Sequence, residues 1–224
     1  MIDNKAIFNI SYGLFVLVAR QGDKDNACII NVAQQVADQQ IMICVNKQNL
    51  THDMVLRTLK FNLCPLCEVS AQPTTLHKEV SAQPTTLHKG EDPMKPFRHF
   101  GFQSGRDVDK FADCQQELRT PNGLLYLPKF INSVISCVVT KSIDLGSHTM
   151  FVAMVQEARL LSESPSITYA YYQQHIKPNP AAAEGTKKKW VCEVCGYVYE
   201  GDELPADFVC PWCKHTASDF KLVE

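Results

Sequence analysis

The stretch IMICVNKQNLTHDMVLRTL, residues 41–59, passes from a strand pattern to a helix pattern within a few positions. Residues 41–45 are apolar and mostly β-branched, which favours a strand. A polar segment follows, and then an apolar-periodic run predicts a helix over residues 52–60. The N-terminus of such a helix favours a bound phosphate, because its free N–H groups and its dipole point at the ligand. Asn49 or Thr51 could instead be an ordinary N-cap, and the local sequence leaves both interpretations open.

Short strand patterns also dominate the sequence on either side of this stretch. Further strands are predicted at 13–19, 27–32, 130–140 and 150–155, and helices only at 3–10, 52–60 and 107–111. Many short strands with few helices are typical of a closed barrel with peripheral helices. We therefore expect a mainly β fold for residues 1–176.

The composition excludes several classes of protein. The 224 residues are 45% hydrophobic and 21% charged, which is ordinary for a folded protein and excludes a disordered chain. A net charge of −2 gives no electrostatic reason to expect nucleic-acid binding. The apolar runs fall short of the ~18 residues of a membrane-spanning helix, and the start of the sequence lacks the pattern of a secretory signal. We therefore expect a cytoplasmic protein that binds neither nucleic acid nor membrane.

Ten cysteines are unusual for a protein of a reducing compartment, where disulfides are rare. Four of them form the pattern CxxC-x14-CxxC near the C-terminus. Two close pairs of thiolates form a tetrahedral sulfur cage that suits zinc or a single iron. A segment as short as residues 190–224 also buries too little apolar surface to fold without a metal or disulfides. The predicted metal ligands are Cys192, Cys195, Cys210 and Cys213.

The surroundings of this cysteine pattern are aromatic. Six aromatic residues lie between positions 190 and 220, and an aromatic shell excludes water from a metal centre and tunes its potential. The motif WVCEVCGYVYE, followed by LPADFVCPWCK and DFK, resembles rubredoxin, the one-iron electron carrier, over residues 190–224. Lys214 departs from that pattern, since the family usually has glycine after its fourth cysteine. The resemblance implies one iron, and a structural zinc ribbon is the alternative.

Residues 177–189, KPNPAAAEGTKKK, contain two prolines and no hydrophobic periodicity, which predicts a tether between folded units. The charge differs across this tether. Residues 190–224 contain seven acidic and two basic residues, a net charge of −5, whereas residues 1–189 contain 17 acidic and 20 basic residues, a net charge of +3. An acidic unit on a short tether can dock on the basic body, or the segment can be a solubilising linker with incidental charge.

Four further motifs carry a resemblance that covers the rest of the chain. ICVNKQNLTHD (43–53), FGFQSGRDVDKFA (100–112), GSHTMFVAMV (146–155) and YAYY (169–172) are similar to the FMN-binding split barrel of the flavin reductase family. With the C-terminal unit added, the whole chain resembles the high-molecular-weight rubredoxins of anaerobic microbes. That resemblance implies a homodimer formed through the flavin domain, with FMN near the subunit interface. Leu59 stands where the family usually has glycine.

The same resemblance implies which residues bind FMN. One group at the strand-to-helix junction would hold the phosphate, a second after residue 30 would line the isoalloxazine and ribityl chain, and a third would close the site. A last residue, His148, matches a family histidine near the flavin, although a lone histidine is more often part of a barrel core. No catalytic acid or base is implied. The groups are Asn46, Lys47, Asn49, Thr51 and His52; then Asn31, Val32, Gln34 and Gln35; and then Ser104, Arg106 and Lys110.

The resemblance also implies an NAD(P)H-dependent oxidoreductase. Nicotinamide gives up two electrons as a hydride and a one-iron centre accepts one at a time, so a flavin, which can do both, belongs between them. The iron would pass electrons to a partner such as a flavo-diiron protein that reduces nitric oxide or dioxygen, or to another redox acceptor. Two alternatives remain: a free flavin reductase with a structural zinc ribbon, and a non-enzymatic carrier with FMN and iron.

Residues 68–89 are two identical copies of EVSAQPTTLHK. Two copies are too few and too polar for a solenoid, and proline beside paired threonines favours a loop. We interpret the segment as an insertion into a surface connection, where added length costs little. The alternative is a metal or partner site built from His77 and His88. Cys64 and Cys67, just before the copies, are interpreted as buried or incidental thiols rather than a redox dithiol.

Overall fold

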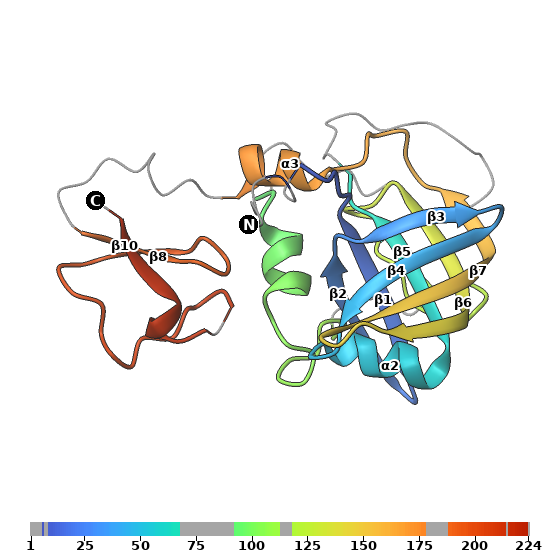
Figure 1. Cartoon of the computed structure of the whole chain (residues 1–224), viewed down its shortest axis with the longest axis horizontal. Coiled ribbons are helices and arrows are strands. Elements are labelled where there is room, and N and C mark those ends of the chain that lie inside the picture. The colour runs from blue at the N-terminus through green and yellow to red at the C-terminus, as the bar shows by residue number, and fades with distance from the viewer. Residues whose placement is uncertain are drawn as a thin grey trace.

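The computed structural model describes residues 6, 9–67, 92–112, 118–177, 188–213 and 215–223. The duplicated segment 68–89, Lys214 and most of the tether lie outside these residues. Within them, the strands form one seven-stranded sheet and a separate three-stranded sheet near the C-terminus (Figure 1). Short helices pack around the larger sheet. The expected mainly β fold with peripheral helices is therefore confirmed.

The larger sheet has the strand order β2-β1-β5-β6-β7-β4-β3, and its neighbouring strands are antiparallel. Its two edge strands are consecutive in the chain and are joined by residues 31–32 alone. This short connection holds the two edges near each other, so the sheet curves into the barrel seen in Figure 1. The strands are β1 (Phe15–Gln21), β2 (Lys24–Ile30), β3 (Ala33–Ala37), β4 (Gln40–Asn46), β5 (Lys60–Pro65), β6 (Ser133–Asp144) and β7 (His148–Leu160).

Two hydrophobic clusters lie on the two faces of this curved sheet. Because side chains alternate along a strand, Val16 and Val18 of β1 enter one cluster, and Leu17 and Ala19 enter the other. The cluster around Leu17 receives side chains from the strands of the barrel wall and fills the interior. The cluster around Val16 lies outside the wall and is covered by the segments at 94–111 and 125–131.

Helix α2 (Leu50–Thr58) covers one end of the barrel, with Met54 and Val55 buried in the interior cluster (Figure 1). It begins two residues before the predicted helix and ends at Thr58. The end is set by Leu59, which has the left-handed backbone conformation (φ 58°, ψ 22°) and donates its N–H to Val55 O at 2.8 Å. This conformation is the physical reason why glycine would suit the position.

Three short helices lie outside the barrel: η1 (Phe97–Gly101), α3 (Tyr169–Tyr171) and η2 (Tyr172–Ile176). Figure 1 shows the green segment that contains η1 on the side of the barrel toward the C-terminal sheet. The rings of Phe97 and Tyr172 pack at a tilt of 33°, with 4.3 Å between centroids, which joins η1 to η2. The sequence patterns did not predict these helices.

The helix predicted at residues 107–111 is wrong, because these residues form turns. Ser104 Oγ accepts from Arg106 N–H at 3.1 Å, and the Asp109 carboxylate accepts from Phe111 N–H at 2.9 Å. Such local acceptors compete with helical hydrogen bonding. The helix predicted at 3–10 falls largely outside the described residues.

The predicted strands are present with shifted bounds, and two strands of the larger sheet, β3 and β5, were not predicted. β6 begins three residues after the start of the pattern at 130–140 but runs on to Asp144, and β7 extends beyond the pattern at 150–155 at both ends, because their ladder continues into exposed residues. The pattern at 27–32 instead ends at Ile30. β3 was not predicted, since four of its five residues are exposed and carry no alternating pattern.

The C-terminal sheet has the order β10-β8-β9, built from β8 (Lys189–Cys192), β9 (Val198–Glu200) and β10 (Phe220–Val223). A single 3-10 turn, η4 (Ala217–Asp219), precedes β10. The core of this C-terminal unit consists of four cysteines and Phe220, with aromatic side chains packed around them. Among the described residues, no helix of either unit has the length and apolar character needed to cross a membrane.

Candidate functional site

The four predicted metal ligands converge in the C-terminal unit. Cys192, Cys195, Cys210 and Cys213 are buried, and their sulfur atoms all lie within 4.8 Å of one another. The Sγ atoms of Cys192 and Cys213 are 3.5 Å apart, as are those of Cys195 and Cys210. A tetrahedral site with metal–sulfur bonds of about 2.3 Å has edges of about 3.8 Å, which lies between the 3.5 Å of these two pairs and the 4.8 Å upper limit of the cluster, so small shifts around one ion complete the site.

The backbone near these cysteines is arranged to support thiolates. Gly196 has φ +79° and donates its N–H to Cys192 O at 2.8 Å, which closes the first turn. In the second turn, burial alone would raise the pKa of Cys210, but the backbone N–H groups of Cys213 and Trp212 donate to its sulfur and lower that pKa. A thiol that loses its proton easily is a ready metal ligand.

Aromatic rings surround the sulfur atoms. Tyr197 meets Trp212 edge-on at 5.3 Å between centroids, and Phe208 meets Phe220 edge-on at the same distance. These contacts cover the cysteine cluster with apolar surface, as the sequence led us to expect. Such a shell limits solvent access and thereby influences a reduction potential.

A second candidate site lies at the N-terminus of α2. A cavity of about 250 Å³ opens there, between the first turn of the helix, β2 and the turn after η1. Four of the predicted FMN-binding residues line it: Asn49, Thr51, Ser104 and Lys110. Its other lining residues are Asn26, Cys28, Gln48, Leu50, Gly101, Phe102, Gln103, Gly105, Asp107, Cys213 and His215.

Lys110 is a buried basic group in this cavity, whose lining also includes the acidic residue Asp107. The Nζ atom of Lys110 donates to Ala27 O at 2.8 Å and to Phe100 O at 3.0 Å. Burial lowers the pKa of Lys110 to about 8, although the neighbouring Cys28 works in the opposite direction. Among the described residues, no carboxylate neutralises this ammonium group, so it can attract an anion.

Another residue of the cavity wall is Asn26, which is buried in β2. Its amide Nδ2 donates to Thr51 Oγ1 at 2.9 Å. Its Oδ1 is buried and has no hydrogen-bond partner among the described residues. Gly105 lies against this amide, since a Cβ at position 105 would stand 1.9 Å from Asn26 Oδ1. An unpaired buried acceptor in a cavity wall suits a ligand that carries a donor.

Several other predicted FMN-binding residues lie around the α2 N-terminus but do not line the cavity. They are engaged in a hydrogen-bonded rim that connects α2, β4 and β7. The contacts are Asn46 Oδ1 accepting from Gln48 N at 2.9 Å, Lys47 Nζ to Asp144 at 2.6 Å, His52 Nε2 to Thr149 Oγ1 at 2.9 Å, Arg106 to Asp53 at 2.7 Å, and His148 Nδ1 to Ser147 Oγ at 2.9 Å.

The remaining predicted FMN-binding residues lie elsewhere. Asn31 and Val32 form the connection between β2 and β3, and Gln34 and Gln35 are exposed on β3 at the sheet edge. None of these four lines the cavity. Sequence reasoning also missed Asn26 and Gly105: Gly105 lies within the quoted motif FGFQSGRDVDKFA, but nothing in the sequence pairs it with Asn26.

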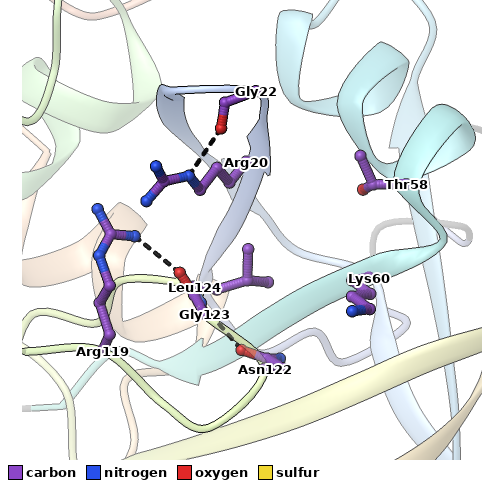
Figure 2. A pocket seen from close by; sticks show the side chains of 8 residues that line it. All are labelled: Arg20, Gly22, Thr58, Lys60, Arg119, Asn122, Gly123 and Leu124. Atoms are coloured by element: carbon purple, nitrogen blue, oxygen red, sulfur yellow. Dashed lines mark hydrogen bonds between the residues drawn. The ribbon is translucent and has the colours of Figure 1, made fainter.

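A larger cavity, of about 440 Å³, has Arg20 and Arg119 among its lining residues (Figure 2). Its arginines are already engaged: Arg119 donates to both carboxylate oxygens of Asp25, at 2.7 and 3.0 Å, and to Gly123 O at 2.8 Å. Arg20 Nε donates to Gly22 O at 2.8 Å. No predicted FMN-binding residue lines this cavity, so the smaller cavity at α2 is the better candidate site.

Comparison with known proteins assigns both units to families. A family model described as "Flavin reductase like domain" matches residues 7–180, and one described as "Rubrerythrin, rubredoxin-like domain" matches residues 190–221. The high molecular weight rubredoxin of Moorella thermoacetica is 29% identical, over 95% of this chain and 96% of its own length. The ferric-chelate reductase (NAD(P)H) of Archaeoglobus fulgidus is 28% identical, over 76% of this chain and 89% of its own.

The barrel also has structural neighbours. The NADH:FAD oxidoreductase SgcE6 of Streptomyces globisporus C-1027 superposes with a TM-score of 0.55 at 17% identity, covering 74% of this chain and 85% of that chain. This likeness supports the fold. Together with the family match over residues 7–180, it shows that the chain belongs to the flavin reductase like domain family and carries a rubredoxin-like domain at 190–221.

Proposed function

We propose that this chain is an NAD(P)H-dependent oxidoreductase that binds FMN in the barrel and one iron in the rubredoxin-like unit, and passes electrons from the first to the second. The observation that carries this proposal is a shared cavity wall. Cys213 of the four-cysteine cluster lines the same cavity as Lys110 and the first turn of α2. When bound, FMN exchanges electrons in pairs with a nicotinamide and singly with an iron centre.

The residues of the α2 cavity fit a flavin phosphate. The ammonium group of Lys110 and the N–H groups in the first turn of α2 offer positive charge to a phosphate. Asn26 Oδ1 is free, among the described residues, to accept a hydrogen bond from a ligand hydroxyl. Asn49, Thr51 and Ser104 add polar side chains to the same wall. The rim residues and the β2–β3 connection remain our prediction for other parts of the flavin.

The four-cysteine cluster fits a single metal ion with thiolate ligands, and we propose iron as the resident ion. The dense aromatic cover favours this choice, because a zinc ion with a purely structural role has no potential to be tuned. We further propose a homodimer formed through the barrel. The electron acceptor would be a flavo-diiron protein or another redox partner.

Two relatives support the assignment of a nicotinamide donor and of two coupled units. The relative named high molecular weight rubredoxin aligns along both units, which supports a combined function. The relative named ferric-chelate reductase (NAD(P)H) supports NAD(P)H as the donor to the barrel. The competing function is a free flavin reductase, in which the barrel reduces flavin and the C-terminal unit binds zinc in a structural role. Four thiolates also bind zinc.

An anaerobic titration of the purified protein, with metal and flavin analysis, tests the proposal. We expect about one FMN and one iron per chain, and we expect NADH or NADPH to bleach first the flavin and then the iron absorption. Zinc in place of iron would support the competing function. Bleaching of the flavin with an iron absorption that persists would exclude electron transfer between the units.

A further inference from the structure

The rubredoxin-like unit is seated on the barrel through its second cysteine turn. The guanidinium carbon of Arg98, in η1, lies 4.9 Å from the centroid of the Trp212 ring. Trp212 stands between Cys210 and Cys213 in the sequence, and its ring packs against the outer cluster of the barrel. Asp92 forms an ion pair with Arg98, which holds the guanidinium in place from the barrel side. The contact therefore joins η1 directly to a ligand-bearing turn of the metal cluster.

A further contact extends this junction. Phe102, just after η1, packs against both the outer cluster of the barrel and the cysteine cluster. Behind it, Phe97 of η1 packs against Tyr172 of η2, with 4.3 Å between ring centroids, and both side chains are buried in the outer cluster. The junction therefore rests on Phe102 as well as on the contact between Arg98 and Trp212.

The junction brings the metal cluster to the edge of the α2 cavity. Cys213 and His215 contribute to the wall of this cavity, and Lys110 and Thr51 contribute from the barrel. Cys213 is therefore the ligand residue that adjoins the candidate flavin site. Electron transfer slows steeply with distance, so docking that brings a ligand residue to this site shortens the route between the two centres.

We propose that Arg98 and Trp212 form an intramolecular latch that docks the rubredoxin-like unit over the α2 cavity, with Cys213 as the ligand through which electrons enter the iron centre. This inference rests on the proposed function. Each transfer takes one electron from the reduced flavin and converts Fe(III) to Fe(II). Because a hydride brings two electrons, two such transfers follow each donor oxidation, and a one-electron acceptor re-oxidises the iron between them.

The chemistry of the latch suits reversible docking. A guanidinium over an indole is attracted by the ring quadrupole, with a strength that supports contact without making it permanent. The acidic rubredoxin-like unit, with its net charge of −5 over residues 190–224, adds attraction toward a cationic residue on the barrel. The short tether keeps the local concentration high, so the unit can release to meet an acceptor and then return.

Substitutions of Arg98 in the full-length protein loaded with flavin and iron test the latch. Arg98→Glu removes the cation and repels the acidic unit, whereas Arg98→Lys keeps the charge but loses the planar group. Arg57→Glu is the matched control, because Arg57 is an exposed arginine in the last turn of α2 and lies outside both cavities. Flavin and iron contents verify that each variant folds.

Two readouts are compared, hydrogen exchange at residues 97–105 and the rate at which chemically reduced flavin reduces the iron. For Arg98→Glu we expect faster exchange at 97–105, unchanged exchange in β4, and iron reduction slowed about ten-fold. Arg98→Lys should fall between this variant and the wild type, and Arg57→Glu should match the wild type in both readouts.

The outcomes separate the latch from the proposed function. If Arg98→Glu changes neither exchange nor rate, the latch is wrong. If exchange rises while the rate stays the same, the docked arrangement is not the route of electron transfer, which also overturns the inference. If reduced flavin never reduces the iron in the wild type, the proposed function fails, and the exchange data alone then decide whether docking occurs.

Discussion

The amide of Asn26 and the hydroxyl of Thr51 are joined by a hydrogen bond of 2.9 Å that links β2 to the first turn of α2. Both side chains are buried, and both line the α2 cavity. Gly105 approaches the same amide so closely that a Cβ there would stand 1.9 Å from Asn26 Oδ1. The shape of the candidate flavin site therefore depends on a glycine that no turn geometry demands.

Gly105→Ala should weaken FMN binding at least ten-fold while the protein stays folded. The added methyl group must displace the Asn26 amide, which loses its bond to Thr51 and shifts the cavity wall. Gly101→Ala is the comparison, since Gly101 lines the same cavity but a Cβ at 101 would lie 3.5 Å from Ile29, an ordinary contact that leaves the Asn26 amide in place. Equilibrium titration of the flavin-free protein measures both. Wild-type affinity in Gly105→Ala would place the flavin elsewhere.

The affinity for FMN should depend on the protonation of Lys110. Burial lowers the pKa of Lys110 to about 8, so the group is an ammonium below that pH and a neutral amine above it. A flavin phosphate favours the ammonium form, which means that FMN binds more tightly below pH 8 and more weakly as the pH rises to 10. Titrations between pH 7 and 10 should show this decline for FMN.

Riboflavin, which lacks the phosphate, is the ligand control for Lys110 and should show no such decline. Lys110→Met should weaken FMN binding about ten-fold at pH 7 and remove its dependence on pH. A variant that binds FMN as tightly as the wild type would remove Lys110 from the phosphate site.

Leu59→Gly should stabilise the barrel by about 0.5–1 kcal/mol. The left-handed conformation costs a residue with a side chain roughly 1–2 kcal/mol, and glycine avoids this cost. The greater conformational freedom of glycine in the unfolded state offsets part of the stabilisation. Leu56→Gly is the control, because Leu56 and Leu59 are equally exposed at 46% but Leu56 is inside α2. That change should lower the free energy of unfolding by about 1 kcal/mol. Denaturant unfolding that ranks the two variants in the opposite order would refute the argument.

The cysteines outside the cluster should have no part in metal binding. Cys64 is buried in β5, and burial, reinforced by Cys137, raises the pKa of its thiol far above the ordinary value. Cys64→Ala should therefore leave the iron content unchanged, whereas Cys210→Ser should abolish it and unfold the C-terminal unit. Metal analysis and hydrogen exchange of residues 188–223 measure the two effects. Loss of iron in Cys64→Ala would show that Cys64 takes part in metal binding.

The sequence predicted those parts of the protein whose chemistry is local. Cys192, Cys195, Cys210 and Cys213 lie in two short turns, so their spacing already determines that four sulfur atoms meet. The junction of β4 and α2 was likewise readable, because its strand pattern and helix pattern adjoin in the sequence. The mainly β class followed from the number of apolar runs.

Other features depend on long-range contacts that no sequence window contains. Asn26 and Gly105 are 79 positions apart, and only the packing of the turn after η1 against β2 brings them together. β3 carries mostly exposed residues and is recognised only by its pairing with β4. The predicted helix at 107–111 failed because the Ser104 and Asp109 side chains accept local hydrogen bonds that favour turns.

The central claim is that electrons pass from nicotinamide through a flavin to the metal within one protein molecule. Anaerobic single-turnover mixing of the oxidised protein with NADH or NADPH, observed at the flavin and iron absorption bands, tests it most directly. We predict flavin bleaching first and iron bleaching second, with a second phase whose rate does not change when the protein is diluted ten-fold. Iron bleaching that slows in proportion to dilution, or that precedes the flavin phase, would contradict the claim.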